Sequence, residues 1–312
     1  MSARIAMSWR TERNSCAAAP LTPFPRCGLL LRDVAFLMPV TALLLPASAF
    51  HPAVGPPTVA QLTALIDEMR NSDLSIRLNA FRSLPHIAQA MGTEKTRKQL
   101  IPYVSVLVEN CDDDDEVLLL LASILGGMVD EVGGAEFAHA LLQPLEQLTG
   151  ADDAAVRNKA VESIGKLIAQ MSEAHVTEYL MPLLRRMATA EWLTSRISAS
   201  GLFHLVYPRV GDAARKELRS LFCALCRTEE TPTVKRAATE HLGPFASVVE
   251  PKTVYDELFP VLQKLAKDEQ DSVRLLTISA CVAIAKIFAK DNKSLNVRPN
   301  NRPPGWPGRR GL

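Results

Sequence analysis

Hydrophobic and polar positions repeat along the middle of this 312-residue chain. Successive repeats lie 41 residues apart once and then 39 residues apart. Six segments align on one position that is basic in five of them, and its residues are Arg77, Leu118, Arg157, Arg196, Lys235 and Arg274. Apolar residues recur just before this anchor and seven and ten positions after it, with a mostly small residue three positions after it. That spacing predicts the buried face of an amphipathic helix.

A second leucine-rich helix is predicted ahead of each of the last five segments. Four of these helices carry a proline at the same place, where the missing N–H should bend the helix, namely Pro102, Pro144, Pro182 and Pro260. Polar turns join the two helices at 112–115, 152–153, 231–232 and 268–271. Asp and Thr in these turns can accept hydrogen bonds from the free N–H groups that begin the next helix.

Two antiparallel helices per ~39 residues match the HEAT repeat. We therefore predict an all-α fold, a HEAT-repeat α-solenoid of about six helix pairs over residues 58–290. One pair cannot bury its own apolar stripe, so the pairs must stack. The short turns within the pairs should then follow one another along one edge.

The two ends of the chain differ from this middle region. Residues 1–57 carry arginines and then an apolar run at 34–50, which includes the small residues Ala47-Ser48-Ala49 near its end. This pattern fits either an organelle-directed leader or a disordered extension. The run is short for a membrane helix and contains prolines, so we expect no stable membrane span. Residues 291–312 are rich in Pro, Gly and Arg and are predicted to be disordered.

Charge and motifs exclude several classes of function. The net charge is +1, but the ends are basic and residues 58–290 are acidic, which disfavours nucleic-acid binding. The six cysteines form no disulfide framework, and we expect Cys223 and Cys226 to be buried small hydrophobes. The sequence contains no P-loop, GxSxG or HExxH motif. We therefore predict no catalytic residues, no metal and no cofactor, and hence a protein that is not an enzyme.

Long segments of the repeat region resemble one family. "EWLTSRISASGLFHLVYPRV", "DDDDEVLLLLASILG", "VRNKAVESIGKL" and "LAKDEQDSVRLLTISACVAIA" are similar, in order, to the scaffolding A subunit of protein phosphatase 2A over about residues 62–289. The resemblance implies a non-catalytic HEAT scaffold whose N-terminal repeats bind regulatory B subunits through the intra-repeat turns. The family's catalytic subunit is held by later repeats, so we expect this chain not to bind it.

The resemblance also selects candidate binding residues in four of the turns. They are Asp112, Asp113, Asp114, Asp115, Glu116, Trp192, Leu193, Thr194, Ser195, Arg196, Glu229, Thr231, Pro232, Lys235, Arg236, Asp268, Glu269, Gln270 and Asp271. Trp192 stands out because the equivalent residues of the other repeats are polar. An aromatic side chain there suggests a binding anchor, or else one that folds over a neighbouring helix. The repeated arginines could bind a partner or bond to turn carboxylates such as Asp153 or Asp271.

Three further readings stay open. A chain of this length could compete for regulatory subunits without assembling a phosphatase, or it could be another HEAT-repeat adaptor. An enzyme that uses Ser195 and His204 is the third, although the repeat register does not place His204 as a base for Ser195. For localisation we expect the cytoplasm, the nucleus or both, with an organelle as the alternative if residues 1–50 are a leader.

Overall fold

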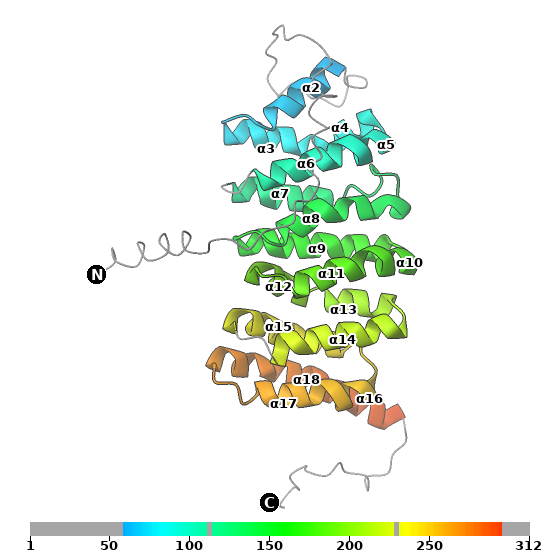
Figure 1. Ribbon diagram of the computed structural model, residues 1–312, viewed down its shortest axis with the longest axis vertical. Coiled ribbons are helices and arrows are strands. Elements are labelled where there is room, and N and C mark those ends of the chain that lie inside the picture. Colours follow the sequence, from blue (N-terminus) through cyan, green and yellow to red (C-terminus); the bar gives the residue numbers. More distant parts are fainter. Residues whose placement is uncertain (1–58, 111–113, 228–230, 295–312) are drawn as a thin grey trace, which may run out of the picture. The chain divides into compact units, whose positions relative to one another are not determined.

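The computed structural model describes residues 59–110, 114–227 and 231–294, and every regular element among them is a helix (Figure 1). The predicted all-α solenoid class is confirmed by these stacked helix pairs. The predicted leader at 1–57 lies outside the described residues, as do Asp112, Asp113 and Glu229. The disordered tail was predicted to begin at residue 291, and this is wrong for residues 291–294, because the last described helix continues to Ser294. The rest of the predicted tail, 295–312, lies outside the described residues.

The helices form two rows. In the first row are α2 (Val59–Glu68), α5 (Thr93–Lys95) with η3 (Thr96–Leu100) and α6 (Ile101–Glu109), η4 (Ala135–Leu141) with α8 (Leu142–Leu148), α10 (Glu173–His175) with η5 (Val176–Leu180) and α11 (Met181–Ala188), α14 (Asp212–Arg227), and α16 (Pro251–Thr253) with η7 (Val254–Leu258) and α17 (Phe259–Leu265). In the second row are α3 (Leu74–Arg82) with α4 (Leu84–Met91), α7 (Asp115–Leu125), α9 (Ala154–Gln170), α12 (Leu193–Ser200) with α13 (Phe203–Val206) and η6 (Tyr207–Arg209), α15 (Pro232–Ala246) and α18 (Asp271–Ser294).

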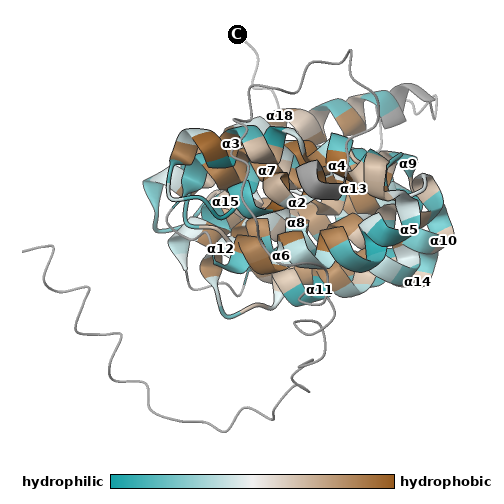
Figure 2. Ribbon diagram, turned by 90° about the horizontal axis from the view of Figure 1, so that it is seen from above, coloured by the Kyte–Doolittle hydropathy of each residue, from teal (hydrophilic) through white to brown (hydrophobic). Residues whose placement is uncertain are grey.

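Helices of the second row pack on one another in chain order, as α3 on α7, α7 on α9, α9 on α12, α12 on α15 and α15 on α18. The first row does the same where α6 meets α8 and α11 meets α14. Most first-row helices also contact their own second-row partner, such as α8 with α9 and α17 with α18. Polar residues cover much of the first-row helices α5, α10, α11 and α14 (Figure 2).

The prolines of the first row act through a local change of helix type. Pro102, Pro182 and Pro260 each stand second in an α-helix that directly follows a five-residue π-helical turn. A proline has no N–H for the carbonyl four residues earlier, and wider i→i+5 bonding is one way for the backbone to absorb that loss. Pro144 instead follows the 3₁₀ helix η4. Where the sequence predicted a bend, the helix changes from π or 3₁₀ winding to α winding just before the proline.

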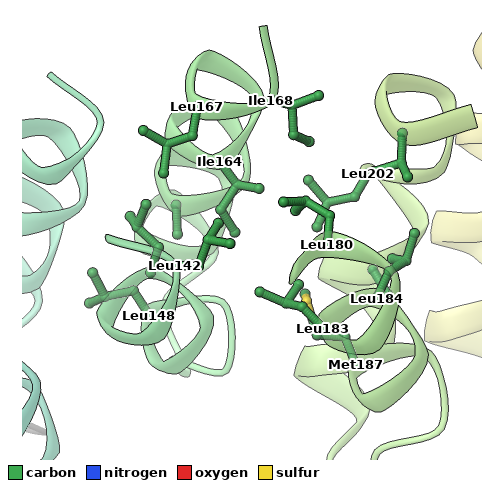
Figure 3. Close-up of a cluster of buried hydrophobic side chains, with 14 of the residues drawn as sticks. Leu142, Leu148, Ile164, Leu167, Ile168, Leu180, Leu183, Leu184, Met187 and Leu202 are labelled. Atoms are coloured by element: carbon green, nitrogen blue, oxygen red, sulfur yellow. The ribbon is translucent and has the colours of Figure 1, made fainter. Parts of the chain in front are cut away.

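Burial follows the repeat register of the second row. The residues seven and ten positions after the anchor are buried in the first five repeats, for example Leu125 with Met128 and Ile164 with Leu167. Figure 3 shows Ile164 and Leu167 beside Leu142 and Leu148 of the neighbouring first-row helix. The same register predicts a buried Cys281 in α18, and that prediction is wrong because Cys281 is exposed. No described helix packs on that side of α18.

Candidate functional site: a ridge of intra-repeat turns

The candidate site is the set of turns that join first-row to second-row helices, here called the turn ridge. Its described residues are 71–73, 110, 114, 149–153, 189–192, 231 and 266–270. The sequence places a polar residue four positions before most anchors, and the structure makes it the N-cap of the second-row helix. The Asp73 carboxylate accepts from the backbone N–H groups of Ser75 and Ile76 at 2.8 and 3.3 Å. Asp153 caps α9 in the same way, at 2.7 and 3.0 Å. These carboxylates satisfy N–H groups that the helix leaves unbonded.

The anchor arginines fasten each turn from within. Arg157 donates through Nη1 to the carbonyl oxygens of Ala151 and Asp152, at 2.8 and 2.7 Å. Arg196 does the same to Ala190 and Glu191, at 2.6 and 2.9 Å. In both repeats the guanidinium bonds carbonyls just beyond the end of the first-row helix, where the helix dipole also favours a positive charge. A structural role for these arginines is therefore built into the turn.

The expected pairing of anchor arginines with turn carboxylates holds for only some residues. Arg274 contacts the carboxylate of Asp271, as predicted. Asp153 was predicted to be such a partner, and the structure corrects this, because its carboxylate caps α9. Carbonyl oxygens of the turn take most of the bonds from Arg157 instead.

Side chains also connect the first turn to the second, and each turn from the third to the sixth to its neighbour. Arg77 bonds Asp114 at 2.6 Å, and Lys235 bonds Asp268 at 3.0 Å. Between these two links, the Thr194 hydroxyl donates to the Gly150 carbonyl at 3.0 Å, and Arg196 approaches the Thr231 hydroxyl at 3.5 Å. These bonds hold the linked turns next to one another along one edge of the described helix pairs.

The Lys235–Asp268 pair is the most enclosed of these links, with side chains 21% and 13% exposed. Burial by itself raises the pKa of Asp268. The Gln270 backbone N–H and the Lys235 ammonium stabilise the carboxylate and outweigh burial, so the pKa of Asp268 lies below its usual value. Asp268 is thus a charged link in the ridge at neutral pH, and Lys235 holds it in place.

Trp192 is the N-cap residue of α12, where other repeats carry Asp or Thr. Its side chain makes no capping hydrogen bond, and 78% of it is exposed. The alternative that it folds over a neighbouring helix is therefore wrong. Leu193 beside it is 43% exposed. Two large apolar side chains are thus exposed where this turn meets α12.

Some of the remaining predicted residues hold the turns in place, and the others are exposed to solvent. Thr194, Ser195 and Arg196 are half-buried, and at least two of them bond to the turns. The other predicted residues that are exposed form the accessible surface of the ridge together with Trp192 and Leu193. They are Asp115, Glu116, Pro232, Arg236, Glu269, Gln270 and Asp271. The accessible ridge is therefore a mainly acidic surface with one strongly apolar position at Trp192 and Leu193.

The histidine and cysteine side chains of the fourth and fifth repeats, which could serve an enzyme as base or nucleophile, are half-buried or buried. His204 stacks on His241, with ring centroids 6.5 Å apart, and burial lowers the pKa of both imidazoles. Burial likewise raises the pKa of the Cys223 and Cys226 thiols, which keeps them protonated at neutral pH. Within 59–110, 114–227 and 231–294, no group of three or more His, Cys, Asp or Glu side chains could hold a metal ion.

The sequence reading missed one surface feature. The last described helix, α18, exposes a row of aliphatic side chains that includes Leu275 and Ile278. By length and composition, residues 271–290 would also be apolar enough to cross a membrane. The sequence could have predicted this row. In residues 271–290 apolar residues occupy the face that the repeat register predicts to be buried and also positions outside it.

Comparison with known proteins identifies relatives over the repeat region. The chain is 47% identical over 238 residues to a probable PP2A regulatory subunit of Caenorhabditis elegans, a match that covers 76% of this chain and 40% of that protein. It is 41% identical to the regulatory A subunit of PP2A from Schizosaccharomyces pombe, over 74% of this chain and 39% of the relative. The beta isoform of the human 65 kDa regulatory A subunit is 44% identical, over 63% and 32%. The chain thus spans about two fifths or less of the length of these relatives.

Solved structures similar to this chain include a designed armadillo repeat protein in complex with the peptide (KR)4 (TM-score 0.40, 16% identity, 72% of this chain and 99% of that one). Cex1p is another (TM-score 0.44, 12% identity, 78% and 51%). No family model matches the sequence. The curated relatives are named as regulatory or scaffold subunits, which supports a non-catalytic chain. The repeat region of this protein is therefore homologous to part of the 65 kDa regulatory A subunit, the scaffold of protein phosphatase 2A.

Proposed function

We propose that the turn ridge binds a regulatory B subunit of protein phosphatase 2A, with Trp192 as its anchor. The observation that carries this proposal is the exposure of Trp192, 78%, at an N-cap position that is polar in other repeats. Leu193 beside it is also exposed, so two large apolar side chains are adjacent at this place. Tryptophan is also among the residues that most often dominate binding energy at protein interfaces.

The bonds around Trp192 support this role because they hold its backbone in place. Arg196 fastens the turn on one side, and Thr194 ties it to the Gly150 carbonyl of the preceding turn. A side chain on a fixed backbone loses less conformational entropy on binding than one on a loose loop. Exposed acidic residues of the ridge, Glu191 beside Trp192 and Glu269 two repeats further on, favour a partner whose contacting surface is basic.

A binding titration of the purified chain with a purified B subunit tests the proposal. Trp192→Ala should weaken binding by about 30-fold, which corresponds to ~2 kcal/mol. Val106→Ala is the matched control, because Val106 is an apolar side chain, 48% exposed, on the first-row helix α6. It should bind with unchanged affinity. Equal affinities for Trp192→Ala and the unmodified chain would remove Trp192 as the anchor.

The proposal leaves two roles for the complex. The chain could act as scaffold, or it could occupy B subunits without recruiting the phosphatase catalytic subunit. Adding this chain to a preassembled trimeric phosphatase separates the two roles. Release of the B subunit would support the competitor role. Co-elution of the B subunit and the catalytic subunit with this chain, in place of the original scaffold, would support the scaffold role.

A further inference from the structure

A tyrosine interrupts the repeat register of the second row, in the same repeat that carries Trp192. Eleven positions after the anchor the other repeats have aliphatic residues, namely Ala88, Val129, Ile168, Ala246 and Ala285. The fourth repeat has Tyr207 at this place, in the 3₁₀ turn η6, and its side chain is fully buried. A buried phenol needs hydrogen-bond partners for its hydroxyl, because an unbonded polar group away from water is costly.

Charged residues that follow in the chain supply these partners. The Tyr207 hydroxyl donates to Glu250 Oε2 at 2.8 Å and accepts from Arg219 Nη1 at 2.9 Å. Arg219 also bonds Glu257 through Nε, at 2.9 Å. Arg215 donates through Nη1 to Glu250 and through Nε to the Tyr207 carbonyl, both at 3.3 Å. These five residues are here called the clasp.

The charges of the clasp support one another. Burial by itself raises the pKa of Glu250, but the Glu250 backbone N–H, the Tyr207 hydroxyl and the two arginines outweigh it, so the pKa of this carboxyl lies below its usual value. Tyr207 therefore donates to a carboxylate, and such hydrogen bonds are stronger than neutral ones. The exposed carboxylate of Asp212 also approaches Arg215, at 3.7 Å.

The clasp joins three consecutive repeats at the edge opposite the turn ridge. Tyr207 ends the second-row segment of the fourth repeat, Arg219 lies on α14 of the fifth, and Glu257 lies in η7 of the sixth. In Figure 1, α13 and α16, which lead into η6 and η7, lie at the edge opposite the beginnings of α12 and α15. Repeats of a solenoid touch only their neighbours, so these contacts set the angle between them. A network across three repeats at one edge therefore fixes the spacing of the turns at the other.

We propose that Tyr207 is a positioning residue for the turn ridge: its hydroxyl closes the clasp, and the clasp fixes the spacing between Trp192 and the turn at 266–270. This inference rests on the proposed function, because the spacing matters to a regulatory subunit that contacts both turns. A partner that meets preset contacts loses less conformational freedom than one that must first order them. Tyr207 lies away from the ridge and acts through the angle between the repeats.

Electron–electron double resonance on the free chain measures that spacing. Replacing Glu191 and Glu269 by p-acetylphenylalanine places nitroxide labels at two exposed ridge positions without using the chain's own cysteines. Tyr207→Phe keeps the ring against Phe245 of α15, where the centroids are 5.4 Å apart, and removes only the hydroxyl. The distance distribution between the labels should then broaden, while circular dichroism shows unchanged helicity.

Two further variants separate the clasp from general effects of mutation. Glu250→Ala removes the acceptor at an exposed position, so it should broaden the distribution without disturbing the core. Tyr255→Phe is the matched control, because this tyrosine is 45% exposed in η7 of the first row. It should leave the distribution unchanged.

A binding titration with a purified B subunit tests the consequence for the ridge. Tyr207→Phe should weaken binding about fivefold, because the partner must then order the turns itself, and Tyr255→Phe should leave the affinity unchanged. Unchanged distances in both Tyr207→Phe and Glu250→Ala would overturn the proposal, and so would broadened distances with unchanged affinity. If Trp192→Ala binds as tightly as the unmodified chain, the proposed function fails, whereas the distances in the free chain still decide whether Tyr207 sets the spacing.

Discussion

Arg157 provides a direct test of how the turns are held. Its guanidinium donates to the carbonyl oxygens of Ala151 and Asp152 at 2.8 and 2.7 Å. Arg157→Met keeps an apolar stem of similar length and removes both bonds. A hydrogen bond from a charged donor contributes about 1.5–3 kcal/mol when it is fully buried. Arg157 is half-buried, so water replaces part of each bond, and we expect a loss of ~2 kcal/mol in the free energy of unfolding.

Urea unfolding followed by far-UV circular dichroism measures this loss, and hydrogen exchange shows where it acts. The amides at the start of α9 should exchange faster, while α15 should change little. Lys159→Met is the matched control on the same helix, because Lys159 makes only a solvent-exposed ion pair with Glu162. It should leave the unfolding midpoint nearly unchanged. Equal midpoints for Arg157→Met and Lys159→Met would refute the idea that the anchor arginines fasten the turns.

Three other predictions follow from the core, the buried histidines and the family relationship. Phe203→Ala should destabilise the chain by about 3–5 kcal/mol, because Phe203 is fully buried against Phe222 and Phe245; an unchanged urea midpoint would contradict this. The lowered pKa values of His204 and His241 mean that the unfolded chain takes up protons first, so stability should fall as the pH drops below about 6.5. His241→Gln should reduce that fall, as judged from thermal midpoints at neutral and mildly acidic pH. By itself this chain should not bind the phosphatase catalytic subunit, and co-purification of the two without a longer scaffold would refute that expectation.

The helical register was predictable because one buried face repeats with the period of a helix. Val156, Ile164 and Leu167 are buried as that spacing predicts. Helix breaks were not predictable from the same pattern. The segment from Leu193 to Val206 reads as one helix, but it divides at Gly201 and Leu202 into α12 and α13. An added Cβ on Gly201 would lie 3.2 Å from the Val161 side chain, so a larger residue there would have to push that side chain aside.

The exposure of Trp192 could be anticipated because its equivalents are polar. The hydrogen-bond partners of the anchor arginines could not be predicted from the sequence. Asp153 can serve either as an N-cap or as an ion-pair partner, and only the backbone geometry decides between these two roles. Cys281 was assigned to the core by the repeat register. Its exposure depends on what packs beside α18, and a single-helix pattern carries no information about the next neighbour.

The central claim is that a regulatory subunit binds along the turn ridge. Hydrogen exchange of this chain with and without a purified B subunit tests it most directly. The account predicts slower exchange at residues 189–194 and 266–270 in the complex, with no change at the opposite edge, where α10 and α16 begin. Protection confined to that opposite edge, with the amides around Trp192 unchanged, would contradict it.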